Sequence, residues 1–238
     1  MKRIIAVIMT FVVLVTAAPV RATEIDDRIA EIQQQIKALK AELNNLKAQK
    51  ASENTTTQHY EIDLSAGYYT IGMDIPVGTY HISSVSGSGN VYCRGGDLNE
   101  IFGGSYGIAE YNNFSAKQDA ILSISSDVVI RLTSENANLG AMISRTVLES
   151  FNWVEAPAGV YTVGIDIPEG CYHVYALSGS GNAHVSDNGH NDGDLNEIFA
   201  VSRDYSGYIT DFYNLYLYDG NELEITSDLL LRFDQVGE

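Results

Sequence analysis

Basic residues are scarce in this chain of 238 residues, which has 14 Lys and Arg against 31 Asp and Glu. Without residues 1–22, which contain three basic and no acidic residues, the remainder carries a formal charge of −20. A surface of this sign repels phosphate groups, so nucleic acid and anionic membranes are excluded as direct ligands. Cations and basic partners remain compatible with it.

Cysteine is also scarce, with only Cys93 and Cys171. Cys171 matches Thr79 in an internal repeat and Cys93 matches Val185, so a disulfide that defines each repeat is excluded. Two isolated thiols are favoured over one bridge between repeats or chains. The chain has no nucleophile elbow, phosphate loop or zinc signature, and no Cys/His pair arranged for catalysis. No catalytic residue is therefore assigned.

The first 22 residues have the pattern of a secretory signal. Lys2 and Arg3 precede an uncharged, mostly apolar run over 4–18, and Val20-Arg21-Ala22 offers small residues at a cleavage site. The alternative is an uncleaved membrane anchor, for which 15 residues are short of the roughly 20 that span a bilayer. We therefore expect a secreted protein that is either released or associated with the cell surface.

A heptad pattern follows the signal. Its members alternate in spacings of four and three: Ile25, Ile29, Ile32, Ile36, Leu39, Leu43 and Leu46. This spacing predicts a coiled coil over 23–50, about 40 Å long, that makes the protein a homo-oligomer. Isoleucine at both core positions of the first half favours three or more strands, whereas leucine in the second half does not discriminate, so the oligomer number stays open. The alternative is a single amphipathic helix that folds back on the rest of the chain.

Residues 67–132 are repeated at 159–233. The copies begin GYYTIGMDIPVGTYHISSVSGSGN and GVYTVGIDIPEGCYHVYALSGSGN, and two further matched blocks follow after insertions. This arrangement is typical of one fold that is present twice with variable loops. The expected segments are a signal peptide (1–22), a coiled coil (23–50), a linker (51–58), β-repeat 1 (59–135), a connector (136–150) and β-repeat 2 (151–238).

Short alternating strands separated by turns predict an all-β fold class, with two tandem antiparallel β-sandwich or jelly-roll-like domains preceded by a coiled-coil helix. Ile-Pro-x-Gly predicts a turn in each copy, with Asp74 and Asp166 accepting hydrogen bonds from its amides. Capping-box spacing predicts one helical turn at 97–100 and at 194–197. Asp219-Gly220 predicts a hairpin.

The shared motifs resemble a β-domain of Gram-positive secreted and surface proteins. The resemblance rests on Tyr-x-x-Gly-x-Asp-Ile-Pro-x-Gly-x-Tyr at 69–80 and 161–172, then Gly-Ser-Gly-Asn, Asn-Glu-Ile-Phe and a last hairpin that is intact only in the second copy. It covers about 165 of the 238 residues. It implies a β-rich module outside the cytoplasm, of largely uncharacterised function, and it carries over no catalytic residue.

Several acidic residues and histidines are candidates for chemistry. Asp187, Asp192 and Asp194 lie in an acidic loop that favours, at most, weak calcium binding, because the spacing departs from an EF-hand. His81 and His173 each follow a strand tyrosine, and we interpret them as structural rather than metal ligands. Four acid pairs are shared by the copies and could serve a glycosidase: Asp74/Asp166, Asp97/Asp194, Glu100/Glu197 and Asp127/Asp228.

Tyrosine is the remaining signal for binding. Strand alternation places Tyr216 and Tyr218 on one face and Leu215 and Leu217 on the other, so leucines in the core would leave these tyrosines exposed to a ligand. The favoured function is a secreted, non-catalytic surface or ligand-binding protein with no cofactor, whose partner is a cell-envelope glycan or protein. The alternatives are a glycan hydrolase that uses the shared acids and a structural envelope component.

Overall fold

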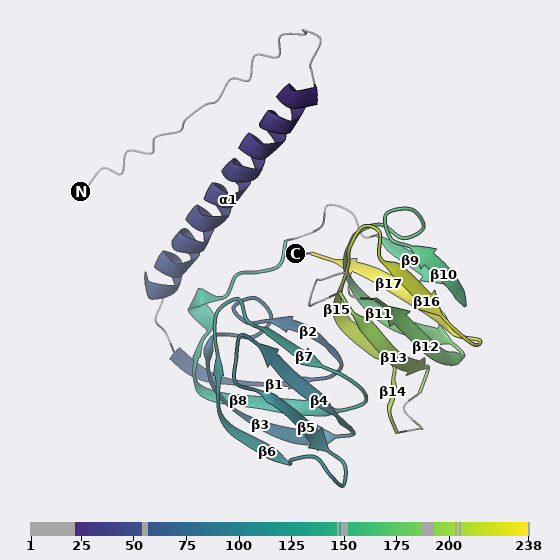
Figure 1. Ribbon diagram of the computed structural model, residues 1–238. Helices are drawn as coiled ribbons and strands as arrows, with labels where there is room; N and C mark the ends of the chain where they lie inside the picture. Colours follow the sequence, from purple (N-terminus) through teal and green to yellow (C-terminus); the bar gives the residue numbers. More distant parts are fainter. Residues whose placement is uncertain are drawn as a thin grey trace. The chain divides into compact units, whose positions relative to one another are not determined.

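The computed structural model describes residues 22–53, 57–146, 148, 152–186, 193–202, 204 and 206–237 (Figure 1). The chain divides into two compact units, Met1–Gln49 and Lys50–Glu238. Residues 1–21, almost all of the expected signal peptide, lie outside the described part. Among the described residues, no helix is both long enough and apolar enough to cross a bilayer.

Helix α1 (Ala22–Glu53) is continuous over 32 residues and contains the whole heptad pattern. The helix runs three residues past the predicted end of the coiled coil, and the next strand begins at Thr57, so the linker is shorter than expected. Six of the heptad aliphatic side chains are described, and their exposed fractions run from 47% at Ile36 to 64% at Leu39. The apolar stripe of α1 is therefore open to solvent in the single chain.

Repeat 1 contains two sheets of four antiparallel strands each. The first sheet has the order β1 (Thr57–Leu64), β8 (Val129–Asn138), β3 (Gly78–Ser86) and β6 (Glu110–Ala116). The second has the order β5 (Asn99–Gly103), β4 (Ser88–Arg94), β7 (Ile121–Ile124) and β2 (Gly67–Thr70). The short 3-10 helix η1 (Leu139–Ala141) follows β8.

Repeat 2 has the same strand order in its two sheets. The first has β9 (Trp153–Ala156), β17 (Leu230–Val236), β11 (Gly170–Ser178) and β15 (Asp211–Leu217). The second has β13 (Leu195–Ala200), β12 (Ser180–Val185), β16 (Glu222–Ile225) and β10 (Gly159–Thr162), with β14 (Tyr208–Ile209) added beside β13 in parallel.

Strand register also matches between the copies. Tyr80 of β3 pairs with Phe114 of β6, and the matched residues Tyr172 and Leu215 pair in repeat 2. Likewise, Glu100 pairs with Val91 as Glu197 pairs with Ala183. Residues that match in sequence can therefore be compared directly in three dimensions.

Each repeat buries its own core between its two sheets. The largest fully buried side chains in repeat 1 include Tyr80, Phe102 and Phe114, and repeat 2 buries Tyr172, Phe199 and Phe233 in the same way. Removing a large apolar side chain from water contributes about 1.5–3 kcal/mol, so these clusters dominate the stability of each repeat. The all-β prediction with antiparallel strands is confirmed.

The Ile-Pro-x-Gly motif is explained by its local contacts. In repeat 1, the Asp74 carboxylate accepts a hydrogen bond from the Thr70 amide at 2.8 Å, and the buried Tyr80 hydroxyl donates to the Pro76 carbonyl at 2.7 Å. The same contacts, at the same distances, recur in repeat 2 at Thr162, Asp166, Pro168 and Tyr172. The predicted turn at Ile-Pro-x-Gly is therefore wrong in place: the turns lie just before it, at 72–74 and 164–166, and Gly78 and Gly170 already start strands. The aspartates do accept amide hydrogen bonds, but from the threonines that precede these turns.

Two further local predictions are wrong. The expected helical turns at 97–100 and 194–197 are absent, because Asn99 starts strand β5 and Leu195 starts strand β13, where the backbone pairs with β4 and β12. Strand formation is favoured over a helical turn because each strand places a phenylalanine, Phe102 or Phe199, in the core.

Asp219-Gly220 forms a turn but not a hairpin. The flanking strands β15 and β16 belong to different sheets, so the turn carries the chain from one sheet to the other. Its closing bond runs from the Asn221 amide to the Tyr218 carbonyl at 3.0 Å, and Gly220 has φ +79°. Asp119 takes φ +62° at the matched position of repeat 1 and replaces the glycine there.

Removal of the tyrosine hydroxyl should weaken each repeat. We expect Tyr80→Phe to lower the free energy of unfolding by about 1 kcal/mol, since the buried Pro76 carbonyl loses its donor, and Tyr172→Phe to lower it by less, because Pro168 is exposed. Urea unfolding measures this. Tyr106→Phe is the control, because Tyr106 is fully exposed and should show no loss. Equal stability of all three variants would contradict the proposed role of the Pro76 and Pro168 contacts.

Candidate functional site

The two repeats are joined by a backbone pairing. Strands β2 and β15 pair in parallel with Gly67 opposite Tyr213, and the Tyr213 amide donates to the Ala66 carbonyl at 3.0 Å. A Cβ atom on Gly67 would lie 2.6 Å from the Tyr213 carbonyl oxygen, so only glycine permits this approach. The pairing merges a sheet from each repeat into one of eight strands. We call this contact the junction.

Side chains extend the junction on both sides of the paired strands. The Asn214 side-chain amide donates to the Tyr68 carbonyl at 2.9 Å. The Tyr68 ring packs edge-on against Phe212, with ring centroids 5.4 Å apart, and belongs to the core of repeat 2. Repeat 2 therefore completes its core with a side chain of repeat 1, which makes the two repeats one block rather than a flexible pair.

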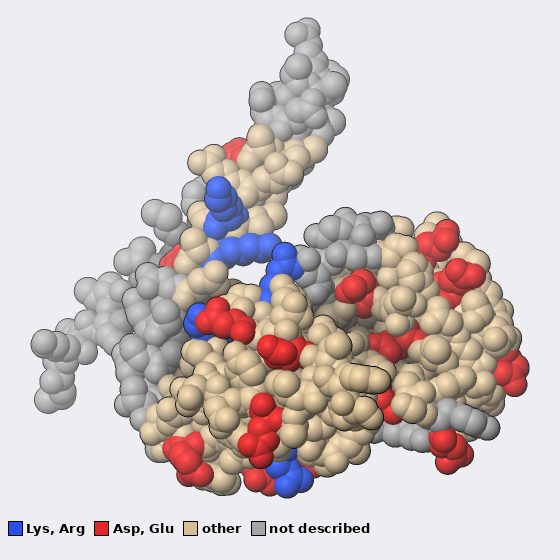
Figure 2. Space-filling model, turned by 60° about the horizontal axis from the view of Figure 1, so that its bottom comes forward, with Lys and Arg blue, Asp and Glu red and all other residues tan. Residues whose placement is uncertain are grey.

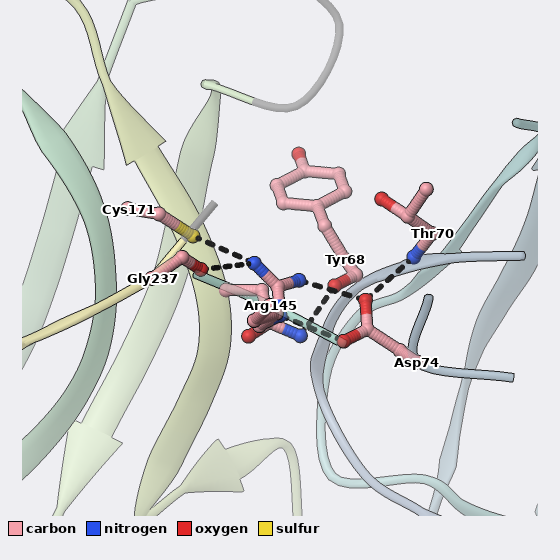
Figure 3. A network of polar contacts seen from close by, with 7 residues as sticks. Tyr68, Thr70, Asp74, Arg145, Cys171 and Gly237 are labelled. Carbon is pink, nitrogen blue, oxygen red and sulfur yellow. Dashed lines mark hydrogen bonds and ion pairs between the residues drawn. The ribbon is translucent and has the colours of Figure 1, made fainter. Parts of the chain in front are cut away.

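A polar network centred on Arg145 also links the repeats (Figure 3). The guanidinium donates to both Asp74 oxygens at 2.8 and 2.7 Å, and its third nitrogen contacts the Gly237 carbonyl at 2.9 Å and the Cys171 sulfur at 3.7 Å. Burial lowers the pKa of Arg145, but the Asp74 carboxylate raises it by more, so the guanidinium stays charged. The connector is thus tied to both repeats.

A cleft of about 270 Å³ opens beside the junction. Repeat 1 contributes side chains from β2, β4 and β7, and repeat 2 contributes them from β15 and from the start of β13. The lining residues are Tyr68, Asn90, Tyr92, Ser123, Ile124, Ser125, Asp194, Asn196, Glu197 and Phe212. We call it the inter-repeat cleft. No lysine or arginine is among these described lining residues, so its polar groups are carboxylates, amides and hydroxyls.

Glu197 is the most perturbed acid of the cleft. Its side chain is only 8% exposed, and both carboxylate oxygens accept a hydrogen bond from the Ser126 amide of repeat 1, at 3.0 and 3.1 Å. Burial raises the pKa of Glu197 to about 7, against the lowering effect of the Ser126 amide, and nearby Asp127 raises it further. The group therefore exchanges its proton near neutral pH.

Asp194 lies in the same cleft and is held by Tyr68. The Tyr68 hydroxyl donates to the Asp194 carboxylate and to its backbone carbonyl. Asp187 and Asp192, the other two residues of the predicted calcium loop, lie outside the described residues. In the described part of the chain, no three His, Cys, Asp or Glu side chains gather as a metal site would require.

The predicted tyrosine face is only partly exposed. Leu215 and Leu217 are fully buried, as expected, but Tyr216 and Tyr218 are half-buried, with ring centroids 4.4 Å apart. Tyr216 lines a second, smaller pocket of about 160 Å³ together with Arg145 and Cys171. This pocket also lies at the junction.

The histidines and cysteines have structural surroundings. Tyr80 and Tyr172 are buried while the histidine after each is half-buried, because adjacent residues of a strand face opposite sides. His81 bonds Asn112 at 2.9 Å, and His173 bonds Asp211 at 3.0 Å and stacks on Tyr213. Both cysteines are buried thiols, and burial raises the pKa of Cys93 to about 11, so its thiol stays protonated at neutral pH.

The sequence gives no reason to prefer Glu197 over Glu100 as a functional acid. The two acids match in the repeat and pair in the same register, but Glu100 is exposed and Glu197 is buried. The difference arises because repeat 1 covers Glu197, while no described residue covers Glu100. No sequence pattern within a single repeat carries that information.

No family model matches the chain, and no curated protein does either. Among solved structures, it is similar to a cupin 2 conserved barrel domain protein from Leptotrichia buccalis, with 11% identity over 76% of this chain and 79% of that chain and a TM-score of 0.20. The regulatory subunit of a cAMP-independent protein kinase A from Trypanosoma brucei shares 7% identity over 75% and 74%, with a TM-score of 0.18. Likeness at these TM-scores says nothing about function.

Glu197 should make stability depend on pH. Its folded pKa of about 7 is raised from 4.5, so its contribution to stability is full below pH 4.5 and is lost as the pH rises through 7. The shift corresponds to up to about 3 kcal/mol. We expect Glu197→Gln, which keeps an acceptor for Ser126, to raise the melting temperature at pH 8 and to change it little at pH 4.

Thermal unfolding at both pH values measures this effect, with Glu100→Gln as the matched control in repeat 1. The control should follow the unmodified chain at both pH values because Glu100 is exposed. If Glu197→Gln also follows the unmodified chain at pH 8, the carboxylate is not desolvated at the junction.

Proposed function

We propose that the chain is a secreted, non-catalytic ligand-binding or surface protein whose copies are gathered by a coiled coil. In this proposal, α1 forms the stalk and each copy presents two sandwich or jelly-roll-like repeats as one block. The observation that carries it is the exposed apolar stripe of α1. Secretion is supported by the signal-like residues 1–22.

Exposed isoleucine and leucine side chains in a heptad pattern favour association with an identical helix. Full burial of each such side chain contributes about 1.5–3 kcal/mol of favourable free energy, and a single helix in water does not gain it. Every described a and d position from Ile29 to Leu46 is aliphatic, so a second copy supplies the complementary surface. Gathered copies would also convert weak binding by each repeat block into avidity.

The inter-repeat cleft is the ligand site that we favour. Amide and hydroxyl groups line it, and Tyr92, at 43% exposed, offers a ring face for stacking. Polyanions are disfavoured as ligands because the cleft contains Asp194 and Glu197 and because the repeats are acidic. Residues 51–150 carry four basic and 11 acidic residues, and Figure 2 shows acidic side chains spread over the visible face. A neutral or basic envelope glycan or protein fits this chemistry, and calcium bound weakly by the 187–194 loop remains compatible with it.

One observation favours hydrolysis as a second candidate function. Glu197 has a raised pKa in a cleft that also contains Asp194, and a carboxyl group protonated near neutral pH is what a glycosidase uses as its general acid. Asp97 and Glu100 are exposed, so such activity would belong to repeat 2 alone. Product release from envelope glycans by the unmodified chain that stops in Glu197→Gln supports hydrolysis. Binding of these glycans by the unmodified chain without any product supports the non-catalytic function.

The stalk is tested by the mass of residues 23–238 in solution. We expect an oligomer for the unmodified chain and a monomer for Leu39→Asp with Leu43→Asp, because two charges enter the apolar seam. Light scattering with size-exclusion chromatography measures this. Gln34→Asp on the opposite face is the control and should remain oligomeric. A monomeric unmodified chain would remove the proposal.

The same proteins then test ligand binding on purified cell envelopes. We expect the unmodified chain to bind and the monomeric double variant to bind at least tenfold more weakly through lost avidity. Tyr92→Ala should weaken binding in both backgrounds, since it opens the cleft without touching the stalk. Binding that depends on the stalk but not on Tyr92 places the ligand outside the inter-repeat cleft.

A further inference from the structure

The junction uses one edge strand from each repeat, and the repeat leaves a matching pair of edges open. Strand β2 of repeat 1 corresponds to β10 of repeat 2, and β15 of repeat 2 corresponds to β6 of repeat 1. While β2 and β15 pair with each other, β10 and β6 each stand at the end of their sheet with a single neighbour among the described strands. Each molecule therefore has two open strand edges, β10 and β6, that correspond to the two strands paired at the junction.

The open edges are exposed where the paired ones are buried. In β2, Tyr68 and Tyr69 are each 7% exposed, whereas Val160 of β10 is 61% exposed. In β6, Asn112 and Asn113 are exposed as well. A row of unpaired strand groups beside an exposed valine is a template for another strand.

The open edges also keep the backbone features that the junction uses. Asn214, which donates to the Tyr68 carbonyl, has φ +57°, and its match Asn113 has φ +59°. Ser126, whose amide binds Glu197, has φ +63°, and its match Ser227 has φ +65°. These conformations are uncommon for residues other than glycine, so the docking geometry is present at both open edges.

Two side-chain requirements are retained too. Gly159 matches Gly67, the residue at which a Cβ atom would block the approach of the partner strand. Glu100 matches Glu197 and is exposed. If repeat 2 of one copy met repeat 1 of another as the two repeats meet within a chain, Glu100 would face the Ser227 amide.

We propose that β10 of one copy docks beside β6 of a second copy, in the parallel arrangement of β2 and β15. Each copy then offers one donor edge and one acceptor edge. Such a head-to-tail contact is heterologous, so it continues into a filament or closes into a ring. This inference goes beyond the proposed function, because it needs neither the stalk nor a ligand.

The contact between copies should be weaker than the junction. At the position of Tyr68, β10 has the smaller Val160, which buries less apolar surface. The ion pair of Arg145 with Asp74 also has no described counterpart at Asp166. Acids also approach one another, since Glu222 and Glu224 of β16 would face Asp97 and Glu100. Salt screens this repulsion, so association should strengthen as the ionic strength rises.

The test uses residues 23–238 with Leu39→Asp and Leu43→Asp, which removes the stalk contact. Sedimentation velocity at high salt and rising concentration should show species larger than a monomer. Val160→Asp on β10 and Asn113→Asp on β6, which removes the amide donor that matches Asn214, should each lower the apparent association constant at least tenfold. Val201→Asp is the control, since Val201 is exposed but lies on neither edge.

Mixing the two edge variants distinguishes this contact from any other. Each variant keeps one intact edge, so an equimolar mixture should form dimers and nothing larger. No self-association of the stalk-free chain at high salt overturns the inference, as does equal association of Val160→Asp and Val201→Asp. Either result leaves the stalk proposal standing, because that proposal is decided by the unmodified helix.

Discussion

The close approach of Gly67 to Tyr213 is the contact on which the rest of the repeat block depends. It lets β2 pair with β15, and that pairing brings Tyr68 into the core of repeat 2 and sets Ser126 against Glu197. The inter-repeat cleft exists only because these strands meet. A side chain at position 67 would separate them and remove the cleft, although each repeat could still bury its own tyrosine and phenylalanine core.

Duplication gave the chain two copies of each acid, and the junction made them chemically different. Glu197 loses its water to the neighbouring repeat and titrates near neutral pH, while Glu100 stays solvated. Asp74 binds Arg145, while its match Asp166 binds only the local amide in the described contacts. New chemistry therefore arises at the contact between copies rather than within either copy.

Much of the fold could be predicted from sequence because its signals are local. Strand alternation predicted that Leu215 and Leu217 share one face, and that face is buried. The sequence also predicted that Asp74 accepts an amide hydrogen bond, although the donor is Thr70 rather than a residue of Ile-Pro-x-Gly. The hairpin prediction identified the turn correctly but not the strand pairing: Asp219-Gly220 forms a turn, but its flanking strands belong to different sheets. The candidate site could not be predicted, because Glu197 and Tyr68 lie 129 positions apart in the chain and meet only through the β2–β15 pairing. Periodicity within one repeat does not encode that contact.

The sharing of Tyr68 also imposes an order of events on biosynthesis. Repeat 1 has every residue of its own core once β8 has been made, whereas repeat 2 draws Ala66 and Tyr68 from a segment synthesised long before it. A completed repeat 1 must therefore wait with an open strand edge and an unburied aromatic ring while about 80 further residues emerge. During that interval, the β15 of another nascent molecule can pair with this edge, so crowded synthesis favours exchange of repeats between chains.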